Sequence, residues 1–331
     1  MEIVEERGSI EHLLESLPRE KDWVSNGNGF ILYDGFWMPP KFLPRVLSFQ
    51  HHYKAEPSDI FLITLPKCGT TWLKALVFSI VNRHRFSLSD SPLLRQNPHA
   101  VVRSFESDLD LQDPKSYLEG LPRPRIISTH LPYHALPPSV RTSGCKIVSI
   151  VRDPRDQFVS SWKFTDKVCH DYTTIRPIEE CFDLFCRGVH NSGPFWDYFL
   201  GSWNASLERP DEVFVTRYEE MKVSPVSETK KLATFLGLPF TEEEDRERVA
   251  EEIVKLCSFD NLKGLEVNKQ GRRPVGVPHE AFFRKGEVGN WTDYLTSSMA
   301  DRLQKIMDDK FANSDLLTFY HPTNSNNEDC A

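Results

Sequence analysis

The sequence predicts an α/β fold, a single domain in which helices flank a central and mainly parallel sheet. Short, nearly continuous apolar runs of strand length recur along the 331 residues, and segments with helical spacing of apolar residues separate them. Strands that are apolar on both faces and connected by helices are typical of a parallel sheet covered on both sides. The 22 Phe and 7 Trp residues supply enough apolar surface for one large core.

Four strands are expected in chain order, at residues 59–65, 125–128, 146–151 and 212–216. Helices are expected at 73–85, 155–168, 178–189, 195–207, 226–236, 242–257 and 297–311. The acidic residues 1–22 are expected to form a flexible arm and 322–331 a disordered tail, which leaves 23–321 as the folded domain. No long linker and no internal repeat divides that domain.

The composition excludes several classes of protein. The 48 acidic and 40 basic residues give a net charge of −8, which disfavours a nucleic acid polymer as partner. No apolar run reaches the ~18 residues that a membrane helix needs, and the acidic N-terminus does not resemble a signal peptide. The seven cysteines are scattered without a CxxC pair, and HExxH is absent. We therefore expect a cytoplasmic protein with reduced thiols and no metal.

A candidate phosphate-binding loop follows the first expected strand. Residues 66–72 read Pro-Lys-Cys-Gly-Thr-Thr-Trp and lead into a helix. In such a turn the backbone amides and the helix N-terminus can hold an anion, and the lysine adds a positive charge. The lysine precedes the single glycine, so the loop is not a Walker A motif, which ends in Gly-Lys-Ser/Thr. The alternative is a helix capped by Thr70 or Thr71, with Lys67 in solvent.

This heptapeptide resembles the 5′-phosphosulfate loop of the cytosolic sulfotransferases, usually written PKSGTTW. Residues 283–291, Phe-Arg-Lys-Gly-Glu-Val-Gly-Asn-Trp, resemble the C-terminal RKGxxGDW motif of the same family. Segments 72–76, 97–99 and 256–268 are similar to the plant branch. The resemblance covers roughly residues 50–315. It implies an enzyme that transfers a sulfuryl group from 3′-phosphoadenosine 5′-phosphosulfate (PAPS) to a hydroxyl group of a small acceptor, without a metal.

The expected catalytic base is His130, which comes just after the second expected strand. A neutral imidazole can accept a hydroxyl proton near pH 7, and the resemblance implies the same role. A zinc site made by His130 and His134 is disfavoured, because Pro132 interrupts any helix that would place both rings on one face. Animal members of the family carry a lysine two residues before this histidine, where Ser128 stands here.

Lys67 is expected to stabilise the phosphate oxygen that gains charge as the S–O bond breaks. Cys68 replaces the usual Ser or Thr of the family. A thiol is a weak hydrogen-bond donor, so we expect the backbone of the loop, rather than this side chain, to contribute. A nucleophilic Cys68 near the helix N-terminus is an alternative, although sulfuryl transfer needs no covalent intermediate.

The resemblance implies that Arg152, Ser160 and the 284–286 triplet bind the 3′-phosphate. It implies that Trp72, Tyr218 and Phe259 contact the adenine. Guanidinium groups suit phosphate oxygens, although an ion pair of Arg152 with Asp153 or Asp156 is an alternative. The expected donor-binding residues are Lys67, Cys68, Gly69, Thr70, Thr71, Trp72, Arg152, Ser160, Tyr218, Phe259, Arg284, Lys285 and Gly286. Tyr133 and Phe164 are candidates for the acceptor pocket.

Two other functions remain open. A P-loop kinase that uses ATP on a small molecule is disfavoured by the missing Gly-Lys-Ser/Thr. A catalytically silent nucleotide-binding protein is disfavoured by the intact pair of Lys67 and His130. Plant members of the family act on flavonols, hydroxyjasmonates, brassinosteroids and similar metabolites, and residues 82–86 and 233–244 lean toward the hydroxyjasmonate type. The dimerisation motif of animal members does not occur at 275–282, so a monomer and a homodimer both remain open.

Overall fold

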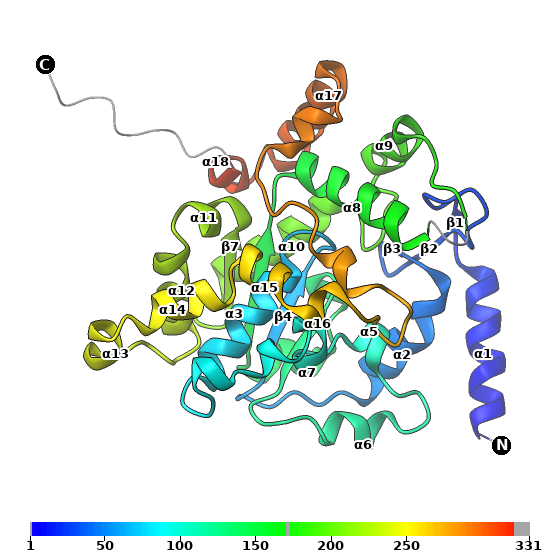
Figure 1. The fold of residues 1–331 in the computed structure, drawn as a ribbon. Coiled ribbons are helices and arrows are strands. Elements are labelled where there is room, and N and C mark those ends of the chain that lie inside the picture. Colours follow the sequence, from blue (N-terminus) through cyan, green and yellow to red (C-terminus); the bar gives the residue numbers. More distant parts are fainter. Residues whose placement is uncertain (1, 170–172, 321–331) are drawn as a thin grey trace, which may run out of the picture.

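The computed structural model describes residues 2–169 and 173–320, so the expected tail at 322–331 lies outside the described residues. A sheet crosses the centre of the molecule and helices pack on both sides of it (Figure 1). The arrangement is the α/β fold that the alternation of strands and helices predicts.

The central sheet has the strand order β5-β4-β6-β7, and all neighbouring strands run parallel. Its strands are β4 (Ile60–Thr64), β5 (Ile126–Thr129), β6 (Lys146–Val151) and β7 (Val213–Arg217). In the register, Leu62 lies opposite Ser128 on one side and Val148 on the other. The chain first adds a strand beside β4 and then crosses to its other side, so the order reverses between β4 and β6.

The residues of β4 are buried on both faces of the sheet. Ile60 and Leu62 pack into a cluster with the apolar side chains of α3 (Thr70–Asn82), α12 (Pro225–Phe235) and α14 (Val249–Leu256). Phe61 and Ile63 point the other way, into a cluster that includes side chains of α2 (Leu43–His52) and α10 (Phe195–Glu208). This two-sided burial explains why the strand reads as a continuous apolar run rather than as an alternating one.

The helices have the following bounds. The α-helices are α1 (Glu2–Ser16), α2 (Leu43–His52), α3 (Thr70–Asn82), α4 (Pro98–Val101), α5 (Phe105–Asp108), α6 (Pro114–Glu119), α7 (Pro138–Thr142), α8 (Pro154–Cys169), α9 (Ile178–Cys186), α10 (Phe195–Glu208), α11 (Tyr218–Val223), α12 (Pro225–Phe235), α13 (Glu242–Arg246), α14 (Val249–Leu256), α15 (Phe259–Gly264), α16 (Glu266–Lys269), α17 (Ser297–Phe311) and α18 (Leu316–Tyr320). The 3₁₀ helices are η1 (Pro40–Phe42), η2 (Leu88–Asp90), η3 (Pro92–Leu94), η4 (Tyr133–Ala135), η5 (His279–Phe282) and η6 (Asn290–Asp293).

One expected helix is wrong. Residues 242–257 form two helices, α13 and α14, rather than one. A capping box between Thr241 and Glu244 starts α13, and Arg248, with φ of 59°, breaks the chain between the two helices. A non-glycine residue in the left-handed region ends the repeating backbone geometry although its side chain favours a helix.

The N-terminal region adds structure that the sequence did not indicate. A second, antiparallel sheet joins β1 (Arg19–Glu20), β2 (Phe30–Tyr33) and β3 (Phe36–Met38) in that order. Residues 1–22, expected to be a flexible arm, contain α1 and β1. Leu13, Leu14 and Leu17 pack partly against the core cluster around α2, so this part of the segment contributes to the packed structure.

Candidate functional site

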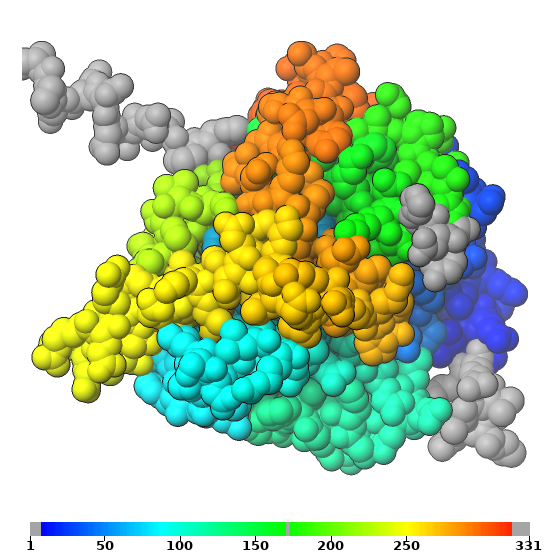
Figure 2. All heavy atoms as spheres, viewed as in Figure 1, coloured from blue at the N-terminus to red at the C-terminus, as the bar shows by residue number. Residues whose placement is uncertain are grey.

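A pocket lies at the carboxyl ends of β4 and β6, where the strand order reverses and where ligands bind in sheets of this kind. Its lining comes from the loop between β4 and α3, the segment after β5, helix α8 and residues 259–286. In Figure 2 the last of these, yellow to orange, spreads across the face of the molecule between the cyan and green segments. The expected site residues that line this pocket are Lys67, Gly69, Thr70, Thr71, Trp72, His130, Arg152, Ser160, Phe164, Tyr218, Phe259, Arg284, Lys285 and Gly286.

The loop between β4 and α3 owes its shape to two residues with positive φ, Lys67 at 71° and Gly69 at 112°. A Cβ atom at position 69 would lie 2.9 Å from Cδ2 of Tyr218 and 3.0 Å from Cδ1 of Ile150, so the turn requires glycine. Helix α3 then begins at Thr70, and no side chain of the described residues caps it. Its first amides can therefore serve an anion.

The two threonines of this loop do not act as caps of α3. The hydroxyl of Thr70 lies 2.7 Å from that of Thr64, and Oγ1 of Thr71 lies 2.9 Å from Nε2 of His99. Gly69 occupies the N-cap position instead. The alternative of an ordinary capped helix is therefore not what the structure contains.

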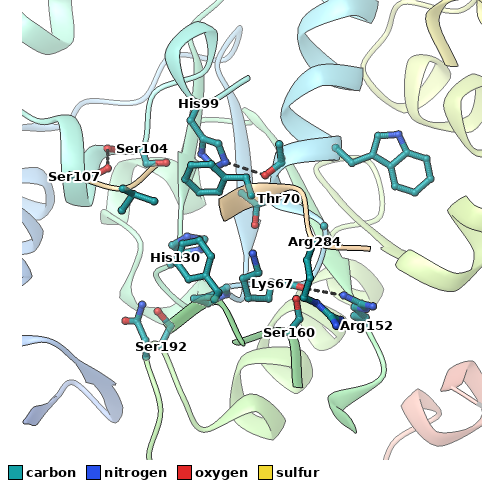
Figure 3. A pocket seen from close by; sticks show the side chains of 18 of the residues that line it. Lys67, Thr70, His99, Ser104, Ser107, His130, Arg152, Ser160, Ser192 and Arg284 are labelled. Atoms are coloured by element: carbon teal, nitrogen blue, oxygen red, sulfur yellow. Dashed lines mark hydrogen bonds between the residues drawn. The ribbon is translucent and has the colours of Figure 1, made fainter. Parts of the chain in front are cut away.

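Lys67 points toward the middle of the pocket, between His130 and Arg284 in the view of Figure 3. Its Nζ lies 4.1 Å from the centre of the Phe164 ring. Burial, together with the nearby cations Arg152 and Arg284, lowers the pKa of Lys67 to about 7. An anion bound among these three cations would reverse the effect and favour the charged lysine. The solvated lysine of the alternative interpretation is therefore not observed.

Arg152 follows β6 directly and is buried at the edge of the pocket. Its Nη1 donates to the carbonyl oxygen of Lys67 at 3.3 Å, and Nη2 donates to that of Glu287 at 2.7 Å. Nη2 also lies 3.5 Å from Oδ2 of Asp156. Arg152 therefore both lines the pocket and forms one of the two ion pairs considered from the sequence. The other candidate, Asp153, pairs with Arg155.

Asp156 is a structural partner of the site that sequence reasoning did not identify as such. Its carboxylate is fully buried and accepts hydrogen bonds from the amides of Gly289 at 2.7 Å and Trp291 at 3.0 Å. Within the same loop, Nη1 of Arg284 donates to Oδ1 of Asn290 at 2.5 Å. These bonds fasten the C-terminal motif to the start of α8. The two bonds to Asp156 join residues more than a hundred positions apart, and the sequence carries no signal for them.

His130 lies just past β5 and lines the pocket. Its Nδ1 is 2.5 Å from the carbonyl oxygen of Thr64, which can only accept, so Nδ1 carries the ring proton. In the neutral ring Nε2 is therefore left as an acceptor. Burial lowers the pKa of His130 below its usual range, against the opposing effect of the Glu106 carboxylate. The ring is neutral near pH 7, as a general base must be.

Glu106 is a second residue that sequence reasoning missed. Its Oε1 accepts hydrogen bonds from Oγ1 of Thr129 at 2.6 Å and from the amide of His130. A bridge between Ser104 and Ser128 places the short helix α5 beside β5 and thereby brings the carboxylate to the site. Glu106 thus holds the backbone of His130 in place, and only the tertiary structure shows this contact.

Two expected site residues do not line the pocket. The Cys68 side chain is buried in the core cluster beside α8, and its amide donates to the carbonyl oxygen of Leu65 at 3.2 Å. Burial raises the pKa of this thiol, which argues against a nucleophilic role. The Tyr133 side chain points away from the pocket. Its hydroxyl accepts a hydrogen bond from Nη1 of Arg209 at 2.9 Å, and its ring packs against the core cluster around α2. Neighbouring positions in sequence do not reveal which way these side chains point.

Aromatic side chains border the part of the pocket that holds Lys67, Arg152 and Arg284, the expected donor end. Trp72 and Tyr218 meet edge to face, with ring centres 5.8 Å apart. Phe259 packs against Gly286, whose φ is 69° and where a Cβ atom would lie 2.6 Å from Cδ2 of the ring. The three aromatic residues expected from the resemblance therefore lie in one pocket, close to the cations.

The other end of the pocket is mostly apolar. It is formed by side chains that the sequence analysis did not identify: Phe36, Met38, Phe42, Val46, Leu131, Val275, Val277 and Phe282. The first four belong to β3, η1 and α2, none of which was expected. Polar side chains that were not expected, including Asn191, Ser192, Ser107 and Arg273, also line the pocket. Such a lining suits a largely apolar compound with a small number of polar groups.

Over residues 2–169 and 173–320, no group of three His, Cys, Asp or Glu side chains has the arrangement of a metal site. Within the same described segments, no helix has both the length and the apolar character needed to span a membrane.

Comparison with known proteins identifies the family. The model of the sulfotransferase domain matches residues 57–315. Cytosolic sulfotransferase 15 of Arabidopsis thaliana is 44% identical over 311 residues, which are 93% of this chain and 86% of the relative. The fold is similar to the crystal structure of an Arabidopsis thaliana sulphotransferase, with a TM-score of 0.71, 38% identity, and 91% and 92% of the two chains covered. A mouse sulfotransferase complexed with PAP gives a TM-score of 0.68 and 26% identity over 88% and 99% of the chains.

An α/β sheet with a phosphate loop at its switch point and a histidine beside it is the arrangement of a group-transfer enzyme. The chain belongs to the sulfotransferase family, in which it is an enzyme of the plant cytosolic type.

Proposed function

We propose that this enzyme transfers a sulfuryl group from PAPS to a hydroxyl group of a small plant metabolite, with His130 as base. The observation that carries the proposal is the hydrogen bond from Nδ1 of His130 to the Thr64 carbonyl, which leaves Nε2 as acceptor. The acceptor's hydroxyl proton moves to Nε2 while its oxygen bonds to sulfur. The bond between sulfur and the 5′-phosphate oxygen breaks, and the 3′,5′-bisphosphate PAP leaves.

The donor is held at the carboxyl ends of β4 and β6. Lys67 and the amides of Gly69, Thr70 and Thr71 bind the 5′-phosphosulfate, and Lys67 stabilises the leaving oxygen. The 3′-phosphate binds Arg152, Ser160 and the 284–286 triplet, where two guanidinium groups face the same pocket. Adenine lies among Trp72, Tyr218 and Phe259. The PAP complex of the mouse relative supports this donor.

The acceptor is a flavonol, a hydroxyjasmonate, a brassinosteroid or a similar hydroxylated metabolite. The apolar and aromatic lining at the end formed by β3, η1 and α2 supports a ring-containing or largely apolar compound. The enzyme acts in the cytoplasm, as the names of its relatives suggest, on a small molecule rather than on a nucleic acid or a membrane. No metal takes part, and the chain acts as a monomer or a homodimer.

The test is sulfation by the purified full-length chain. A panel of hydroxylated plant metabolites is incubated with PAPS labelled in the sulfuryl group, with and without a chelator, and labelled products are separated. We expect transfer to at least one compound of the classes above, at the same rate with chelator. Absence of transfer to every compound, together with absence of PAP binding, would overturn the proposal.

Both alternatives have their own outcome in this assay. Transfer of phosphate from ATP, dependent on Mg²⁺, would support the small-molecule kinase. PAP binding without transfer to any acceptor would support a silent binding protein. The pocket favours sulfuryl transfer over both alternatives, because a neutral His130 and Lys67, whose pKa is about 7, face the same cavity.

A further inference from the structure

A row of hydrogen-bonded side chains leads from the pocket into the core beside α3. Oγ1 of Thr71 lies 2.9 Å from Nε2 of His99, and Nδ1 of His99 lies 3.1 Å from Nζ of Lys74. Nζ also donates to the carbonyl oxygen of Val102 at 3.0 Å and to Oγ of Ser104 at 2.7 Å. Thr71, His99 and Ser104 line the pocket (His99 and Ser104 are labelled in Figure 3), whereas Lys74 is fully buried.

Lys74 is unusual because a buried ammonium group ordinarily has a carboxylate partner. Its Nζ meets three uncharged acceptors instead, and it forms no ion pair within residues 2–169 and 173–320. Burial and, to a smaller extent, Arg273 lower the pKa of Lys74 to about 7, and the carboxylates of Asp108 and Glu106 partly oppose this change. The charge of Lys74 is therefore easily changed near neutral pH.

His99 stays neutral throughout. Burial lowers its pKa well below the usual value, and the positive charges of Lys74, Arg273 and Lys67 act in the same direction. Its ring also stacks on Phe282 with centres 4.1 Å apart, which fixes its plane. A neutral imidazole has one donor and one acceptor, so the direction of both its hydrogen bonds changes together.

The charge of Lys74 therefore determines which atom donates in each hydrogen bond between Lys74, His99 and Thr71. When Lys74 is protonated, its three N–H groups meet Val102, Ser104 and Nδ1 of His99, so Nε2–H donates to Oγ1 of Thr71. The hydroxyl hydrogen of Thr71 is then free to point into the pocket. When Lys74 is neutral, its lone pair accepts from Nδ1–H, and Nε2 accepts the hydrogen of the Thr71 hydroxyl, which is turned away from the pocket.

We propose that Lys74 and His99 are positioning residues that turn the Thr71 hydroxyl toward the donor, and that Lys74 takes up one proton when the donor binds. This rests on the proposed function, because it requires a phosphate of PAPS or PAP at Thr71. The proton comes from solvent, Lys74 gains its charge, and the hydrogen of His99 moves from Nδ1 to Nε2. An anionic phosphate favours this state, since it gains both a donor and a nearby cation.

A double-mutant cycle on PAP binding tests whether Lys74 acts through the Thr71 hydroxyl. Lys74→Met should weaken PAP binding about tenfold when Thr71 is present, because the Thr71 hydroxyl loses its fixed direction. In a Thr71→Val background the same change should cost clearly less, about threefold, since no hydroxyl is left to orient and only the charge of Lys74 is lost. Thr71→Ser, which keeps the hydroxyl, is the matched control and should respond to Lys74→Met as the unaltered chain does.

If Lys74→Met weakened PAP binding equally in the Thr71→Val and unaltered backgrounds, Lys74 would not act through the Thr71 hydroxyl. This result would overturn the proposal. Absence of PAP binding by the unaltered chain would instead overturn the proposed function.

A second measurement does not require the Lys74→Met variant to fold. Calorimetric titration of PAP at pH 8 in buffers of different ionisation enthalpy counts the protons taken up. Lys67 and Lys74 both have pKa values of about 7 in the free protein, so both take up protons when an anion raises these values. Thr71→Val should reduce the uptake and leave the part due to Lys67. The same uptake in both proteins would overturn the proposal.

Discussion

The two ends of the pocket are built in different ways. At the donor end, the proposed contacts to the 5′-phosphosulfate come from one short segment, Lys67 to the first turn of α3, whose shape depends on positive φ angles and a helix start. At the acceptor end, side chains as distant in sequence as Met38, Asn191 and Val277 come together. A site built from backbone needs a fixed motif, whereas one built from side chains accepts many residue combinations. Changes at the donor end should therefore affect all acceptors equally, and changes at the acceptor end only some of them.

His130 lies where the two ends meet, and its loss should have the largest effect. His130→Ala should lower kcat by about 10²–10⁴ for every acceptor, because the proposed reaction transfers the hydroxyl proton to this ring. The Kd for PAP should stay within about twofold, since the nucleotide contacts are unchanged. Single-turnover kinetics and PAP titration measure the two effects.

His134→Ala is the matched control for this prediction. His134 lies four positions further along, is half-exposed, and is bonded to the carbonyl oxygen of Asp34 outside the pocket. It should keep the full rate. Turnover of His130→Ala at more than about a tenth of that rate would contradict the role of His130 as base.

Lys67→Met should have the next largest effect, at the donor end. The single-turnover rate should fall by about 10²–10³ for every acceptor, the usual cost of removing one group that stabilises a developing oxyanion. Lys115→Met, on the exposed side of α6, is the control and should change nothing. A rate loss that differs strongly from one acceptor to another would contradict the division between the two ends.

The role of Lys67 also predicts how the rate depends on pH. The pKa of Lys67 is lowered to about 7 in the free protein, so its charge is present below that pH and lost above it. The kcat/KM for PAPS should therefore fall as the pH rises from 7 to 9. Bound donor raises the pKa, so kcat should stay level to a higher pH. In Lys67→Met the decline in kcat/KM should shrink, and an unchanged decline would assign it to another group.

The parts of the fold that could be predicted from the sequence are those with a strong pattern of apolar residues. Strand 146–151 has the expected bounds because burial on both faces leaves a continuous apolar run. The antiparallel sheet β1-β2-β3 gave no such signal, since its strands are only two to four residues long and partly exposed. The expected helix at 242–257 is in fact interrupted, because the backbone at Arg248 adopts a conformation that its residue type does not favour.

For the site, residues that directly follow a strand could be predicted and their distant partners could not. Lys67, His130 and Arg152 each follow a strand of a parallel sheet, so their meeting at one edge follows from topology. The hydrogen bonds of Glu106 with the His130 amide and of Asp156 with the amides of Gly289 and Trp291 are contacts that only tertiary packing creates.

Phe42→Ala should have the smallest effect and should be the only one of these changes that distinguishes between acceptors. Phe42 lies on η1 and is half-buried at the acceptor end, so truncation enlarges that end without reaching the donor contacts. The kcat/KM should fall about tenfold for acceptors that fill the apolar end and change little for smaller ones. Phe86→Ala, half-buried against Phe78 outside the pocket, is the control. An increase in the KM for PAPS in Phe42→Ala would mean that the two ends are coupled, because a separate acceptor end leaves donor binding untouched.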